Sequence, residues 1–174
     1  MSVIYSEQTN EYINGFLEAI SRVKDILTPS WGGFNQFFSI DKNNTIDVLA
    51  NLKNYIIDNR PHYDCCVDQI QFEKLLDEIQ LSPIANWTTT LPSLISGWTC
   101  DGGLTSINGR NGYILSEYFV KFILTDFFKL HEEEVIVYKL LPDNGYWHWG
   151  DFMGEEFVFE TANKIYILHF GEST

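Results

Sequence analysis

The apolar residues of this chain change their spacing at His131, and this change constrains the fold more than any other feature. Before His131, apolar side chains recur every three or four residues, which is the spacing of one face of a helix. After it they alternate or run together in short stretches, as in strands. The order predicts an α+β fold, with helices over about 10–130 packed on a C-terminal antiparallel β-meander over about 134–170.

Proline, glycine and capping residues divide the helical part. Helices are predicted over 10–27, from Asn44 (as N-cap) to before Pro61, from about Asp68 to Pro83, and over 91–98. In 113–130 the apolar residues cover most of the helical circumference. This segment is therefore predicted to be the central, most buried helix.

The C-terminal strands are predicted over 134–141, 155–161 and 164–170, where β-branched and aromatic residues are frequent. The segments 142–145 and 162–163 carry turn-forming residues, and the second of these suits a tight hairpin. No internal repeat, low-complexity tract or long linker interrupts the 174 residues. A single domain, 1–174, is expected.

The last strand is apolar on both faces. The residues of one face are Ile165, Ile167 and His169, and those of the other are Tyr166, Leu168 and Phe170. A strand of this kind is predicted to lie in the centre of a sheet, or to be covered on both sides.

Charge limits the classes of partner. There are 24 acidic and 11 basic residues, which gives a net charge of −13. Such a surface repels phosphate backbones and anionic lipids, so neither nucleic acid nor membrane is expected as a direct ligand, whereas a basic partner would be attracted.

The N-terminus lacks the pattern of a signal peptide, and the cysteines, Cys65, Cys66 and Cys100, make a poor disulfide framework. A cytoplasmic location is expected.

The stretch YWHWGDFMGEEF, residues 146–157, places a histidine between tryptophans with carboxylates close behind, and its start is a candidate for a further short strand. His148 and Asp151, with His169 and Glu160 as neighbours across the meander, form a candidate metal or acid–base site. No HExxH or HxxxH spacing supports this site. The alternative is an imidazole bonded to backbone, with Trp147 and Trp149 in the core.

Other candidate sites have weaker patterns. His62, Cys65, Cys66 and Cys100 lack the paired spacing of a zinc site, so small buried side chains are the better interpretation of the cysteines. The glycine-rich loop 97–112 matches neither phosphate-binding fingerprint. No cofactor or metal is expected.

Negative charge and aromatic residues concentrate together after His131. Nine acids against Lys139 and Lys164 give a charge of −7 over 131–174. Carboxylates beside exposed aromatic rings are typical of a surface that binds a basic protein. The residues predicted to bind the partner are Trp147, Trp149, Asp151, Glu155 and Glu156, followed by Glu132, Glu133 and Glu134.

The chain resembles the immunity proteins of bacterial toxin systems, including contact-dependent growth inhibition and other polymorphic toxins. The resemblance lies in its general character and in the C-terminal YWHWGDFMGEEFVFETANKIYILHFGEST. It implies a non-catalytic protein that binds a cognate toxin domain, often a basic nuclease, and covers the active site or the nucleic-acid-binding face. Two alternatives stay open: a small metal-dependent or hydrolytic enzyme using His148, Asp151 and His169, and an intracellular scaffold or regulatory subunit.

Overall fold

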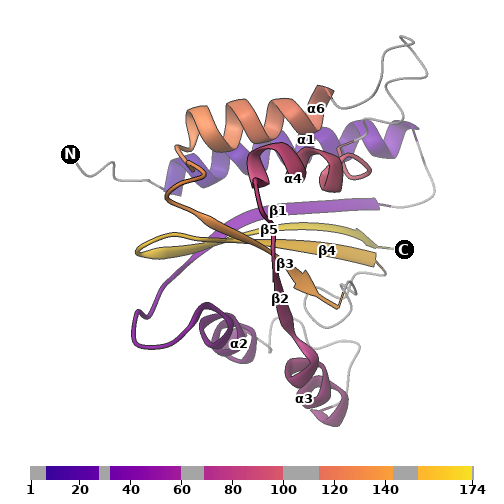
Figure 1. Ribbon diagram of the computed structural model, residues 1–174. Coiled ribbons are helices and arrows are strands. Elements are labelled where there is room, and N and C mark those ends of the chain that lie inside the picture. The colour runs from indigo at the N-terminus through magenta and orange to yellow at the C-terminus, as the bar shows by residue number, and fades with distance from the viewer. Residues whose placement is uncertain (1–6, 28–31, 60–68, 100–113, 143–152, 174) are drawn as a thin grey trace.

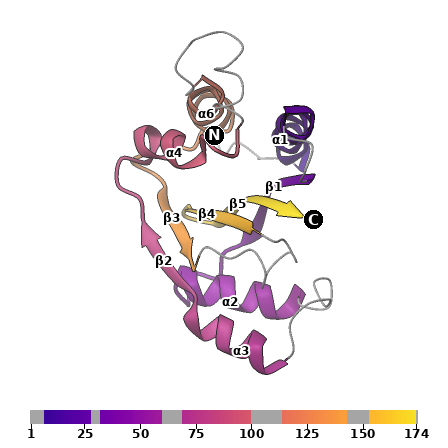
Figure 2. The same cartoon turned by 90° about the vertical axis from the view of Figure 1, so that its right-hand side faces the viewer.

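The structure is a computed structural model that describes residues 7–27, 32–59, 69–99, 114–142 and 153–173. It has an α+β architecture in which one antiparallel sheet carries helices on both faces (Figure 1). Helices α1 (Glu7–Leu27), α4 (Trp87–Ile95) and α6 (Ile114–Tyr118) lie on one side, which we call the α1 face. Helices α2 (Val48–Asn59) and α3 (Gln69–Glu78) lie on the other, the α2 face, as the perpendicular view in Figure 2 also shows.

The sheet has the strand order β1-β5-β4-β3-β2. Strand β1 spans Gly32–Asp41, β2 Gln80–Pro83, β3 Ile136–Leu141, β4 Met153–Glu160 and β5 Lys164–Ser173. Neighbouring strands are antiparallel throughout. The C-terminal meander β3-β4-β5 is confirmed, with β4 and β5 joined at 161–163 by a turn in which the Thr161 N–H donates to the Lys164 carbonyl (3.0 Å).

Strand β5 is central and buried on both faces, as its sequence predicts. Tyr166, Leu168 and Phe170 join the core of the α1 face. Ile165 and Ile167 join the separate core of the α2 face. Because successive side chains of a strand point to opposite sides, this one segment supplies both cores.

Two strands lie in the part of the chain that was predicted to be helical. Strand β1 pairs with β5 over its whole length, from Gly32↔Ser173 to Asp41↔Lys164. Strand β2 occupies the end of the third predicted helix, which stops at Glu78 instead of Pro83. Glycine, asparagine and glutamine dilute the strand pattern of β1, GGFNQFFSID, and its partner lies far along the chain, so local signals do not reveal it.

Helix boundaries also differ in detail. Helix α2 begins at Val48 rather than near Asn44. The capping side chain is Asp47, whose Oδ1 accepts a hydrogen bond from the Ala50 N–H (2.7 Å). The predicted short helix 91–98 is α4, which begins earlier, at Trp87, and contains Pro92.

The segment 113–130 is helical but is not the buried centre of the molecule. Helix α6 continues into a π-helix, η2 (Phe119–Phe127). Phe119, Ile123, Leu124 and Phe128 are buried against the sheet. The opposite side of the same segment faces solvent, so the helix is an outer layer. None of the described helices is both long and apolar enough to cross a membrane.

Candidate partner-binding surface

Several residues predicted to form the site lie outside the described residues. These are Trp147, His148, Trp149 and Asp151, as well as His62, Cys65, Cys66, Cys100 and all but the first residues of the glycine-rich loop. The predictions made for them stay predictions. The described acidic residues occupy three different environments.

Glu155 is held inside the molecule by two hydrogen bonds. Its Oε1 accepts from Lys139 Nζ (2.8 Å) and its Oε2 from the indole N–H of Trp98 (2.7 Å). The Trp98 ring in turn stacks on Phe170, with 5.9 Å between centroids. Both carboxylate oxygens are therefore used within the chain, so Glu155 is poorly placed to pair with a partner's cation.

Glu156 is fully buried, which corrects its placement on a binding surface. It lies opposite His169 on the neighbouring strand, and His169 Nδ1 is 3.1 Å from Glu156 Oε1. The imidazole is fully buried as well. Alternation explains this: in β4 Glu156 shares a face with Val158, which packs in the core of the α2 face.

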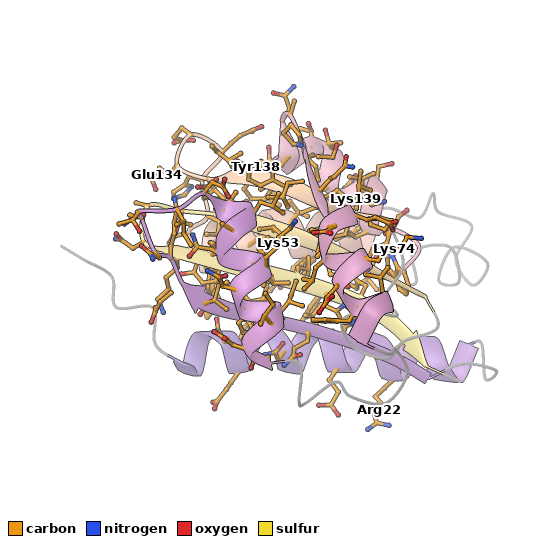
Figure 3. The ribbon with its side chains drawn as sticks, turned by 90° about the horizontal axis from the view of Figure 1, so that it is seen from below. Arg22, Lys53, Lys74, Glu134, Tyr138 and Lys139 are labelled. Atoms are coloured by element: carbon orange, nitrogen blue, oxygen red, sulfur yellow. The ribbon has the colours of Figure 1, made fainter. Side chains whose placement is uncertain are left out.

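His169 and Glu160 were expected as neighbours of His148 and Asp151, which lie outside the described residues, and the structure gives His169 and Glu160 different partners. In the register of the sheet, Glu160 lies opposite Ile165, and its carboxylate contacts Lys42 Nζ (2.7 Å) and accepts from the Tyr138 hydroxyl (2.9 Å). Figure 3, seen from the side of α2 and α3, labels Tyr138 and Lys139 on neighbouring positions of β3. Burial and the Glu160 carboxylate raise the pKa of Tyr138 to about 12. Among the described residues, no group of three His, Cys, Asp or Glu side chains converges as metal ligands would.

Glu132, Glu133 and Glu134 are exposed, as their predicted role requires. They form a turn between η2 and β3. Glu132 is oriented by α4, because its Oε2 accepts a hydrogen bond from the Thr88 hydroxyl (2.7 Å). This acidic turn is the part of the predicted surface that the structure presents to solvent.

A row of aromatic side chains crosses the outer side of α1, α6 and η2. We call it the aromatic ridge; its members are Tyr12, Phe16, Tyr118, Phe122 and Phe127. Tyr12 lies against Phe127 (4.7 Å between centroids), Phe16 against Tyr118 (5.9 Å), and Tyr118 against Phe122 (5.0 Å). Four of these rings are close to half exposed: Tyr12 at 52%, Tyr118 at 44%, Phe122 at 45% and Phe127 at 49%.

The π-helix explains how the ridge remains aligned. In η2 the backbone bonds reach five residues back, as from the Phe128 N–H to the Ile123 carbonyl (2.9 Å). The Thr125 hydroxyl also donates five residues back, to the Val120 carbonyl (2.9 Å). With this wider turn, residues five apart, such as Phe122 and Phe127, come close to one face, whereas an α-helix would turn them apart.

Charged residues flank the ridge with an acidic excess. The exposed charges described on its helices are Glu11, Glu18, Glu117 and Asp126 against Arg22 and Lys121. Arg22 is 3.4 Å from Glu18, and Lys121 Nζ lies 5.5 Å from the centroid of the Phe122 ring. With the acidic turn nearby in sequence, this side of the molecule combines exposed aromatic area with negative charge.

Sequence reasoning missed the ridge because an all-round apolar helix was interpreted as a buried one. The signal that could have revealed it is in the sequence, where a charged residue directly precedes each of three ridge residues. The charged residues are Glu117, Lys121 and Asp126, and the ridge residues are Tyr118, Phe122 and Phe127. Charged residues repeat on the side of the helix where these aromatic rings lie. A fully buried helix would not carry them there.

Comparison with known proteins identifies no relative. No family model matches the chain, and neither a curated protein nor a solved structure is significantly similar to it.

Proposed function

We propose that this chain is an immunity protein that neutralises the toxin domain of a bacterial toxin system by binding it and covering its functional face. The observation that carries the proposal is the aromatic ridge: four rings, each about half exposed, form two contacting pairs, Tyr12 with Phe127 and Tyr118 with Phe122, on the outer helices. Exposed apolar area of this kind on a soluble domain is characteristic of protein–protein contact.

The charge of the chain supports a basic partner. At −13 overall, it would attract a cationic domain over a distance and align it before contact. Aromatic side chains then supply the buried contacts that hold a complex together. A nuclease toxin presents Lys and Arg to its nucleic acid, so an acidic and aromatic surface competes for those same groups.

The catalytic alternative has less support. Its described member, His169, is fully buried and pairs with Glu156, so a substrate cannot reach the imidazole in this conformation. A scaffold or regulatory subunit would use the same surface for a different basic partner. Protection from a toxin separates that alternative from the proposed function.

The test is a protection assay with the toxin domain encoded beside this chain. Cells that express the toxin together with the wild-type chain are expected to grow, and cells that express the Phe122→Asp/Phe127→Asp variant are expected to die. Buried aromatic anchors contribute about 2 kcal/mol each to binding, so loss of both rings should lower the affinity of the purified pair by roughly 1,000-fold.

The matched control is Ile57→Asp, because Ile57 is equally exposed at 49% but lies on α2, on the opposite layer. It should protect like the wild type. Circular dichroism and the thermal midpoint verify that each variant is folded. Full protection by a folded ridge variant, or equal loss in the control, would contradict the proposal.

A further inference from the structure

A groove of about 430 Å³ opens between α4 and the α6–η2 helix, next to the aromatic ridge. Thr88, Thr89, Pro92 and Ser93 line it from α4, and Glu117 and Lys121 from the other side. The last two directly precede the ridge residues Tyr118 and Phe122 in sequence. A groove of this size is large enough to receive one long side chain of a partner docked on the ridge.

The threonine hydroxyls of the groove are arranged as acceptors. The Thr88 O–H donates to Glu132 Oε2 (2.7 Å), and the Thr89 O–H donates to the Asn86 carbonyl (2.9 Å). A hydroxyl has one proton to donate and two lone pairs. Since both protons are used within the chain, the remaining capacity of these oxygens is to accept hydrogen bonds from a ligand.

The charges of the groove favour a cation. Glu117 lines it, and the Thr88 hydroxyl holds the Glu132 carboxylate beside it. Among its described lining residues Lys121 is the cation, and its Nζ lies 5.5 Å from the Phe122 ring centroid. Two carboxylates against one ammonium leave net negative charge beside acceptor oxygens.

We propose that this groove binds an arginine side chain of the basic partner. Arginine has five N–H donors in a planar fork and no acceptor, which suits Glu117, Glu132 and the threonine oxygens. The apolar stem of the side chain would lie against Pro92. A second copy of this chain is a poorer occupant, because it carries the same charge of −13. The inference rests on the proposed function and specifies the chemistry of its partner.

The test uses N-acetyl-arginine methylamide as the probe and the full chain as the receptor. NMR amide signals of Thr88, Thr89 and Ser93 should shift saturably, with a Kd on the order of 1 mM, as expected for a ligand of this size. The citrulline analogue has nearly the same shape without the charge. It should bind at least about 5-fold more weakly, since it loses the charge-assisted hydrogen bonds.

Three variants define the chemistry. Glu117→Gln should weaken binding of the arginine probe by about 5-fold or more, and Lys121→Gln should strengthen it, because the competing ammonium is removed. Asp77→Asn, an exposed acid on α3, is the matched control and should leave the Kd unchanged. Equal binding of citrulline, shifts spread over the whole surface, or weaker binding by Lys121→Gln would overturn the inference.

The two proposals fail separately. If the ridge variant loses protection but the groove does not bind arginine, only the inference about the groove is wrong. If the groove binds arginine saturably but the chain gives no protection, the toxin proposal is wrong and the groove remains a binding site for a basic protein.

Discussion

Three glutamates of β4 lie within six residues and have three different surroundings. Glu155 bridges Lys139 and Trp98 on the α1 face, Glu156 is buried with His169 on the α2 face, and Glu160 contacts Lys42 and Tyr138. Alternation assigns each carboxylate to a face, and the neighbouring strands supply its partner. A count of negative charges cannot distinguish these roles.

Glu156 is expected to affect folding and not partner binding. Glu156→Leu would remove the carboxylate that contacts the buried His169 imidazole (3.1 Å), which should cost about 3 kcal/mol of unfolding free energy. In the Glu156→Leu/His169→Leu double variant the loss should be clearly smaller than the sum of the single losses, because the two groups are in contact. Urea denaturation gives these values. Additive losses would show that the pair is not coupled.

Tyr138 is expected to set part of the alkaline limit of stability. Its pKa is raised from 10.0 to about 12, so the unfolded chain ionises first. The stability from the neutral phenol is fully present below pH 10 and is lost as pH rises from 10 through 12. Tyr138→Phe should lower the free energy of unfolding by about 1.5 kcal/mol at neutral pH, because the hydrogen bond to Glu160 is lost. Above pH 10, the stability of this variant should decline less steeply than that of the wild type.

Urea midpoints across this pH range, with phenolate absorbance to follow ionisation, provide the measurement. An unchanged alkaline decline in Tyr138→Phe would assign the effect to another group.

Both edges of the sheet carry features that hinder strand addition. At the β1 edge, Asn14 of α1 satisfies both backbone groups of Phe37: its Oδ1 accepts from the N–H (2.6 Å), and its Nδ2 donates to the carbonyl (2.9 Å). At the other edge, β2 is four residues long and ends in Pro83. Short edge strands, proline and covering side chains are known protections against edge-to-edge association. A partner is therefore expected to contact helices instead of extending the sheet.

Asn14→Ala should destabilise the chain by about 2 kcal/mol, since two hydrogen bonds are lost and the backbone groups of Phe37 are left without them. The variant should also self-associate at high concentration, as the β1 edge becomes available. Asn54→Ala, at an exposed position of α2, makes the same change in helix propensity without touching an edge. Urea denaturation and light scattering test this expectation, and equal behaviour of the two variants would contradict it.

The molecule as a whole has an aromatic outer side on the α1 face and a strong negative charge. A contact formed by such a surface should depend on the two features differently. Apolar contacts mainly slow dissociation, whereas exposed charges mainly speed association and lose their effect in salt.

Neutralising the acidic turn, as Glu132→Gln/Glu133→Gln/Glu134→Gln, should slow association with the proposed toxin partner by up to about 10-fold at low salt. The association rate of this variant should also depend less on salt than that of the wild type. Stopped-flow or surface plasmon resonance measurements over a range of salt concentrations test this. The control neutralises Asp58, Asp77 and Glu78 on α2 and α3. If it slows association equally, net charge and not the acidic turn is responsible.

Local patterns in the sequence were sufficient for much of the fold. The change of spacing at His131 predicted the C-terminal meander, and the two apolar faces of β5 predicted its central position, because a period of two or of about 3.6 residues is a property of the chain itself. Glu132, Glu133 and Glu134 are exposed, and their role in binding stays a prediction.

Pairing and burial depend instead on contacts between distant segments. Strand β1 exists because β5, more than a hundred residues later, offers it a full register. Glu156 is buried because α2 and α3 cover its side of the sheet, and Tyr118, Phe122 and Phe127 are exposed because no described helix covers theirs. Each of these outcomes depends on which surface packs against which, and residue spacing along the chain does not contain that information.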